Sequence, residues 1–295
     1  MSTSKFTVDC MRLKNNLRFI KTFCRLLRHR IKCLKWLIQF YKVKYYKLYP
    51  QHLIKLEVEL SDKVIILAPH ADDEWIGPYS LINLKKQGIK VVYFNLFGGN
   101  NDNDNLLTRN AEILASSKYW NFDLINNYNY DVNSLYYVLK NSTICFLPSP
   151  YDWHDEHRNV FQTFVQAYDR LNEEQRSKLV VYYYCVSVPH ICNQYLYYLP
   201  LSRNEVLEKW RQFFKIYRSQ SFMPAFRYIL QLKLVPSFVG DYAQTYIKAE
   251  SDRLKKDYEM SKDLSFIKFI TKSKLYIDDI YKIRKYINMP LDNNR

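Results

Sequence analysis

The chain has 295 residues and a mass of 35.8 kDa, and its 44 Lys and Arg residues against 29 Asp and Glu residues give a formal net charge of +15. Apolar residues make up 48% of the chain, which excludes a disordered protein or a small disulfide scaffold. This length predicts one large domain with an extension or two modest domains, since a domain holds roughly 100 to 200 residues.

The first 50 residues are strongly basic, with thirteen Lys or Arg residues and one acid, whereas residues 51–295 have a net charge of only +3. Residues 13–46 contain no Gly or Pro, and their apolar residues recur at three- and four-residue steps, which predicts an amphipathic helix. We expect residues 12–47 either to bind an anionic membrane surface or to pack on the protein or a partner. Nucleic acid is disfavoured, because no nucleic-acid motif accompanies the charge.

Three features of the sequence indicate where in the cell the protein resides. Lys or Arg interrupts every apolar stretch near the N-terminus before it reaches signal-peptide length, and no stretch approaches the roughly 20 residues of a membrane span. Six Cys residues form no Cys-x-x-Cys pair, which argues against a disulfide framework and a cysteine zinc site. We therefore expect a cytoplasmic protein, one that can attach peripherally to the inner face of the membrane.

Beyond Pro50 the pattern changes to short apolar runs that alternate with helical segments. Residues 64–68 (Val-Ile-Ile-Leu-Ala) are typical of a strand buried on both faces. Further strands are predicted over 90–97, 143–147 and 179–188, and helices over 81–87, 109–117, 160–171, 205–217, 242–260 and 277–287.

This alternation predicts an α/β fold with a Rossmann-like, open, mainly parallel sheet flanked by helices. We expect three segments. Residues 1–50 form a basic helical extension, residues 51–220 form the catalytic core, and residues 221–295 form a helical extension packed on that core.

The residues that follow the first strand of this sheet carry the first group of reactive side chains. His70, Asp72, Asp73 and Glu74 emerge where the buried strand 64–68 opens into a loop. Ligands bind at the carboxyl ends of strands in such sheets. Because neighbouring side chains point in different directions, one Asp is expected to face a metal with His70 and the other to face substrate. Glu74 is expected to fix the loop rather than to ligate.

A second group, residues 152–158 (Asp-Trp-His-Asp-Glu-His-Arg), follows the predicted strand 143–147. His154 and His157 are three residues apart, a spacing that puts both near one face at the start of a helix. Both groups should lie at the same sheet edge. Together they would supply two His and one carboxylate to a zinc ion with an open fourth position, as in hydrolytic sites. The same ligand set also accepts iron(II) or cobalt.

Three stretches carry a family resemblance: Pro-His-Ala-Asp-Asp-Glu at 69–74, His-Asp-Glu-His at 154–157, and residues 209–220, which end in Tyr-Arg-Ser-Gln. Over roughly residues 62–220 the chain resembles the PIG-L/LmbE-type family of zinc-dependent N-acetylglucosamine deacetylases. The resemblance implies one Zn²⁺ per chain, with His70, Asp73 and His157 as its ligands.

The resemblance also implies roles for neighbouring residues. Asp72 resembles the general base, His154 the group that stabilises the oxyanion, and Arg109 an arginine that contacts substrate. Trp153 is expected either to stack on a sugar face or to pack in the core. Ala71 and Glu156 replace the Pro and Asp that are commoner in the family, but neither change removes an expected ligand.

The expected function is hydrolysis of the N-acetyl group of an N-acetylglucosamine-type sugar or glycoconjugate, in glycan or cell-envelope biosynthesis. A lipid-linked or nucleotide-linked substrate would suit the basic N-terminal segment. Two alternatives stay open. One is a related zinc amidase that acts on another small amide conjugate. The other is a catalytically silent adaptor that uses the basic helix to bind a membrane or a partner.

Overall fold

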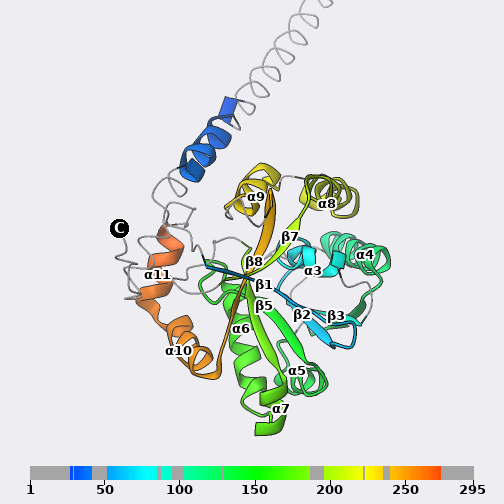
Figure 1. The fold of residues 1–295 in the computed structure, drawn as a ribbon, viewed down its shortest axis with the longest axis vertical. Helices are drawn as coiled ribbons and strands as arrows, with labels where there is room; N and C mark the ends of the chain where they lie inside the picture. The colour runs from blue at the N-terminus through cyan, green and yellow to red at the C-terminus, as the bar shows by residue number, and fades with distance from the viewer. Residues whose placement is uncertain are drawn as a thin grey trace, which may run out of the picture.

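The computed structural model describes residues 27–28, 30–41, 52–84, 88–94, 103–127, 129–186, 196–221, 223–234 and 240–273. In this part of the chain an eight-stranded sheet lies between two groups of helices (Figure 1). The strands are β1 (Leu53–Lys55), β2 (Val64–Ala68), β3 (Ile89–Tyr93), β4 (Asp123–Asn126), β5 (Ile144–Pro148), β6 (Val180–Tyr184), β7 (Leu196–Leu201) and β8 (Tyr242–Lys248).

The N-terminal basic helix, defined as helical residues 27–28 and 30–41, projects outward from the α/β body in Figure 1, where it is blue, and contacts that body through Trp36 and Phe40. The remaining helices belong to the body. They are α2 (Asp73–Ile76), α3 (Tyr79–Leu84), α4 (Asn103–Trp120), α5 (Val132–Leu139), α6 (Asp155–Tyr168), α7 (Glu173–Lys178), α8 (Arg203–Ile216), the 3-10 turn η1 (Arg218–Gln220), α9 (Ala225–Leu232), α10 (Ser251–Lys262) and α11 (Leu264–Ser273).

The strand order is β1-β7-β8-β6-β5-β2-β3-β4. β8 is antiparallel to both of its neighbours, and the other pairs are parallel, so the expected open and mostly parallel α/β sheet is confirmed. From β2 the chain moves to β3 and β4 on one side and returns to β5 and β6 on the other. The carboxyl ends of β2 and β5 therefore flank the point where the strand order reverses, which is where open α/β sheets bind ligands.

Strand β2 lies at the centre of the molecule because all five of its side chains are apolar and buried. Val64, Ile66 and Ala68 face one core, which includes Trp75, Phe213 and other residues of α2, α3, α8 and α9. Ile65 and Leu67 face the other core, formed with residues of α5, α6 and α10. An apolar strand between two helical layers has this pattern because alternate side chains point to opposite faces.

The expected helix over 242–260 is only half correct. Residues 242–248 form β8, and α10 begins at Ser251. The polar Gln244 in this segment is buried, because its amide oxygen accepts from Ser80 N–H at 2.6 Å and its amide nitrogen donates to Ile76 O at 2.8 Å. Both partners lie more than 160 residues away along the chain, so no local pattern in 242–248 indicates this strand.

The described residues leave some of the predicted elements untested, and they include elements that were not predicted. The expected helices over 277–287 and over the part of 13–46 before residue 27 lie outside the described residues. The division into three segments stays a prediction, although β8, which lies beyond residue 220, is a central strand. β1, β4, β7 and α5 were not predicted from the sequence.

Lys209 of α8 is a charged residue placed in the core. Its side chain is buried, its Nζ donates to Ile76 O at 3.3 Å, and the same nitrogen lies 5.1 Å from the centre of the Tyr79 ring. Burial lowers the pKa of Lys209 to about 7, because the ammonium form loses hydration inside the protein. The folded protein therefore releases a proton at this site that the unfolded chain retains up to its higher, ordinary pKa.

We predict that Lys209 makes folding stability rise with pH between about 7 and 10, since only the unfolded chain holds this proton in that window. The free energy of unfolding of Lys209→Met should therefore rise less steeply with pH than that of the wild type. The difference between the two slopes should be up to about 1.4 kcal/mol per pH unit. Urea unfolding at several pH values measures both slopes. Lys215→Met, at an exposed position of the same helix, is the matched control. Equal slopes for wild type and Lys209→Met would contradict the prediction.

Candidate metal centre

Two loops at the carboxyl edge of the sheet form the candidate site. β2 ends at Ala68, and after a short turn α2 begins at Asp73. β5 ends at Pro148, and α6 begins at Asp155 with His154 at its N-cap. Because β2 and β5 are paired and parallel, the residues that follow them are brought together, as the sequence predicted.

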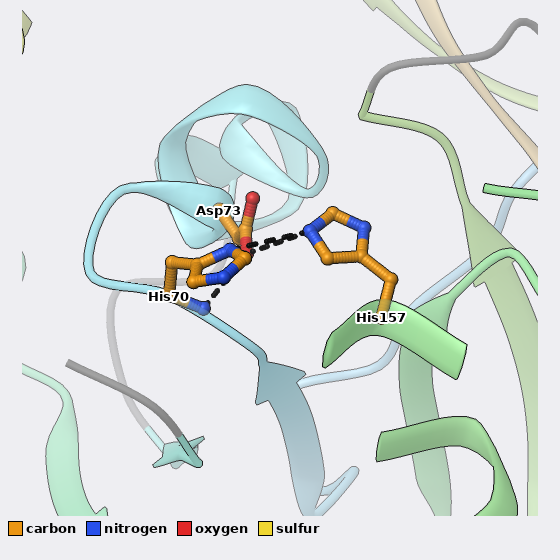
Figure 2. Close-up of side chains that lie close together, drawn as sticks. All are labelled: His70, Asp73 and His157. Atoms are coloured by element: carbon orange, nitrogen blue, oxygen red, sulfur yellow. Dashed lines mark hydrogen bonds and ion pairs between the residues drawn. The ribbon is translucent and has the colours of Figure 1, made fainter. Parts of the chain in front are cut away.

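His70, Asp73 and His157 meet in front of these two strand ends (Figure 2). Asp73 Oδ2 lies 3.2 Å from His70 Nδ1 and 3.4 Å from His157 Nε2, and these two nitrogens are 3.3 Å apart. The three atoms thus form a nearly equilateral triangle. In a tetrahedral zinc site with bonds of about 2.0–2.1 Å, neighbouring ligand atoms are about 3.3 Å apart. The spacing and the chemistry of these donors therefore fit such an ion.

Charge at this point favours a bound cation. Burial acts to raise the pKa of Asp73, but the charges and hydrogen bonds of His157 and His70 lower it far below its ordinary value. Burial acts to lower the pKa of His157, but the carboxylates of Asp152 and Asp73 outweigh it and raise this pKa to about 10. The carboxylates thus stabilise positive charge between them. A metal ion would take the place of the His157 proton, because only a neutral imidazole can ligate.

Asp152 is a functional candidate to which the sequence analysis gave no role. Its Oδ2 lies 3.3 Å from His157 Nδ1, on the side of the ring away from Asp73. It is buried, and its pKa is lowered to about 2, because the attraction of His157 outweighs the cost of burial. A carboxylate behind a ligating His fixes the ring orientation and raises its basicity. The signal in the sequence was an Asp in the same strand-end loop as the two His residues.

Asp72 is buried beside this triangle in a backbone conformation that is rare outside glycine, with φ 125° and ψ −21°. Burial and the charge of Asp73 raise the pKa of Asp72 well above its ordinary value, while Arg109 acts in the opposite direction. Arg109 Nη2 lies 3.5 Å from Asp72 Oδ2. A carboxylate with a raised pKa at a strained position is typical of a proton-transfer group.

The buried carboxylate of Glu74 fixes the backbone of Asp72. Its Oε2 accepts from Asp72 N–H at 3.1 Å, and its Oε1 accepts from Ser116 Oγ at 2.9 Å and from the Tyr217 hydroxyl. Ser116 in turn accepts from the Trp75 indole N–H at 2.8 Å. Glu74 therefore fixes the loop, as expected from the sequence, and connects it to α4 and to the end of α8.

Arg109 of α4 is held in its orientation by hydrogen bonds to η1 and to Glu112. Its Nη1 donates to Ser219 Oγ at 3.0 Å and to Glu112 Oε2 at 3.2 Å. With its amide oxygen turned towards Arg109, Gln220 accepts from Nη1 at 2.8 Å and from Nη2 at 3.0 Å. Glu112 also accepts from Ser219 N–H at 2.7 Å. The Tyr-Arg-Ser-Gln stretch noted in the sequence thus orients the arginine that faces Asp72.

His154 and Trp153 lie at the outer side of the site, and both are half-buried. Their rings stack with centres 3.7 Å apart, and the His154 ring centre is 5.1 Å from that of His157. Burial and the charge of His157 lower the pKa of His154. Trp153 therefore packs on His154 rather than within either core, and its contact with a sugar stays a prediction.

The comparisons with known proteins address the fold. No family model and no curated protein sequence matches the chain. The conserved protein TT1542 from Thermus thermophilus is similar in structure, with a TM-score of 0.51 and 17% identity over 64% of this chain and 95% of its own.

Two further solved structures each match 64% of this chain. N,N'-diacetylchitobiose deacetylase from Pyrococcus horikoshii has a TM-score of 0.44 and 16% identity over 84% of its length. The 4-carboxy-2-hydroxymuconate hydratase GalB from Pseudomonas putida has a TM-score of 0.49 and 14% identity over 96% of its length. The chain therefore has the α/β fold of TT1542, a mostly parallel open sheet flanked by helices.

Proposed function

We propose that this protein is a zinc-dependent amidohydrolase that removes the N-acetyl group from an N-acetylglucosamine-type sugar or glycoconjugate. The observation that carries the proposal is the triangle of His70, Asp73 and His157 atoms, which has the spacing of three zinc ligands and a proton-transfer carboxylate, Asp72, next to it. The resemblance of residues 62–220 to the deacetylase family supports an N-acetyl substrate.

His70, Asp73 and His157 would hold the ion, and Asp152 would keep the His157 ring in place. When bound, zinc supplies a Lewis acid and lowers the pKa of an attached water towards about 7. Asp72 accepts the proton of the attacking water, a role that its raised pKa suits. Arg109 keeps the Asp72 carboxylate oriented for this transfer.

The hydrolysis forms one C–O bond and breaks the amide C–N bond. As the carbonyl oxygen gains negative charge, the ring N–H of His154 donates a hydrogen bond to it. Asp72 or His154 then delivers a proton to the departing nitrogen, so the products are a free amine and acetic acid, which ionises to acetate. The half-buried position of His154 beside His157 suits contact with a substrate that enters from the outer side.

We predict that the purified protein binds about one zinc per chain and that His157→Ala and Asp73→Ala lose it, since each change removes a ligand atom. Elemental analysis after gel filtration measures the stoichiometry. His52→Ala, at an exposed His outside the site, is the control and should keep the metal. Full zinc content in a folded His157→Ala protein would contradict the ligand assignment.

A separate prediction concerns Asp152. Asp152→Asn should still bind zinc, because all three ligands remain, but with an affinity about 10- to 100-fold lower, since the His157 ring loses its charged partner. Competition with a chromogenic chelator measures the affinity. The exposed Asp169→Asn, at the end of α6, should bind as wild type does. An unchanged affinity in Asp152→Asn would show that this carboxylate does not support the site.

We predict that Asp72→Asn keeps zinc but lowers acetate release by about 10²- to 10⁴-fold, because the amide cannot accept the proton of water. Acetate release from a panel of N-acetylhexosamine conjugates measures the activity. Asp123→Asn, on the exposed edge of β4, is the matched control. Release only from acetamides that are not sugars would favour the alternative zinc amidase. Wild-type turnover in Asp72→Asn would exclude Asp72 as the base.

A further inference from the structure

The N-terminal basic helix has two apolar faces, and one of them packs on the body of the protein. Trp36 and Phe40 are buried and form a small core with Leu230 of α9 and with Leu234. Cys33 and Leu37 lie partly buried against the same core. This contact accounts for one side of the helix and attaches it to α9.

The opposite face is a stripe of large apolar residues that are exposed to solvent. Successive members are four or three residues apart, so they line one side of a helix about 20 Å long. Exposed apolar surface of this extent marks an interaction site in a soluble protein. The stripe consists of Leu27 (48% exposed), Ile31 (59%), Leu34 (58%), Ile38 (49%) and Tyr41 (61%).

Basic side chains flank this stripe on both sides. One row consists of the exposed residues Arg28, Lys32 and Lys35, each of which directly follows a stripe residue in the sequence. The exposed Arg30 lies on the other side of the stripe. No acid occurs anywhere in residues 10–56 of the sequence. A second copy of the helix would therefore set bases against bases, whereas a partner with negative charge and an apolar interior would satisfy both features.

We propose that this face of the N-terminal basic helix binds the surface of an anionic phospholipid bilayer. The apolar stripe enters the boundary between headgroups and acyl chains, and the flanking bases contact the lipid phosphates. The helix lies on the bilayer rather than crossing it: in the described part of the chain, no helix is long and apolar enough to span a membrane. The proposal does not depend on the proposed function.

The contact with α9 makes this attachment relevant to the candidate site. α9 begins at Ala225, a few residues after η1, whose Ser219 contacts Arg109. Trp36 and Phe40 therefore hold the proposed lipid-binding face against α9, the helix that follows η1 along the chain. A protein held in this way would meet amphiphilic molecules within the plane of the bilayer surface.

Flotation of the full chain with phosphatidylcholine vesicles, with and without phosphatidylglycerol, tests the proposal. The wild type should float with the anionic vesicles and dissociate as salt is added. The double variant Ile31→Asn/Leu34→Asn should partition at least tenfold less. The control Leu207→Asn/Leu264→Asn, at exposed apolar positions of α8 and α11, should float as the wild type does. Because all four positions are exposed, thermal unfolding should confirm that both variants fold.

A second variant separates the charge from the apolar stripe. Arg28→Gln/Lys32→Gln should weaken binding to anionic vesicles roughly 30-fold, from about 1 kcal/mol for each base near the surface. Three results would overturn the proposal. The first is equal flotation of the wild type with both vesicle types, and the second is flotation of Ile31→Asn/Leu34→Asn at the wild-type level. The third is that neither the wild type nor this variant floats, while sedimentation velocity shows a wild-type dimer that the variant does not form. The last result would make the stripe a self-association surface.

Discussion

The structure depends on the Asp73 carboxylate, a charged group that is buried where two parts of the chain meet. Its Oδ2 accepts from the His70 backbone N–H at 2.8 Å and faces the ring nitrogens of His70 and His157. One oxygen atom therefore connects the loop after β2 to the first turn of α6. A buried carboxylate requires positive charge or hydrogen-bond donors around it, so this contact constrains both loops.

A second buried carboxylate, Glu74, fixes the backbone of Asp72, the residue next to Asp73. It accepts hydrogen bonds from the Asp72 backbone, Ser116 and Tyr217, which belong to three different segments. The unusual φ of Asp72 is held by these partners, because such a conformation persists only where the surrounding structure determines it. The two adjacent carboxylates therefore have different surroundings. Asp72 faces Arg109, and Asp73 faces the two His residues.

Strands β2, β3, β5 and β6 and most residues of the candidate site could be predicted from the sequence, because short apolar runs and clustered reactive residues leave local signals. The run at 64–68 predicted β2 to the residue, and the two groups that follow strands do meet. β8 could not be predicted, since the partners of Gln244 are remote in the chain. The role of Asp152 was missed for a similar reason: its value lies in its position behind His157, which only the folded loop defines.

The position of β8 has a consequence for the order in which the chain is synthesised. β2 to β6 are five adjacent strands of the eight-stranded sheet and are complete by residue 184, and the group of His70, Asp73 and His157 is complete by residue 157. β1 and β7 pair with each other, and β8 is the strand that joins them to β6 in the described sheet. While β8 is still being made, the Tyr-rich edge of β6 has no neighbour on that side. A ribosome-bound chain therefore reaches a stage at which His70, Asp73 and His157 have all been synthesised but this edge is open to pairing with other chains.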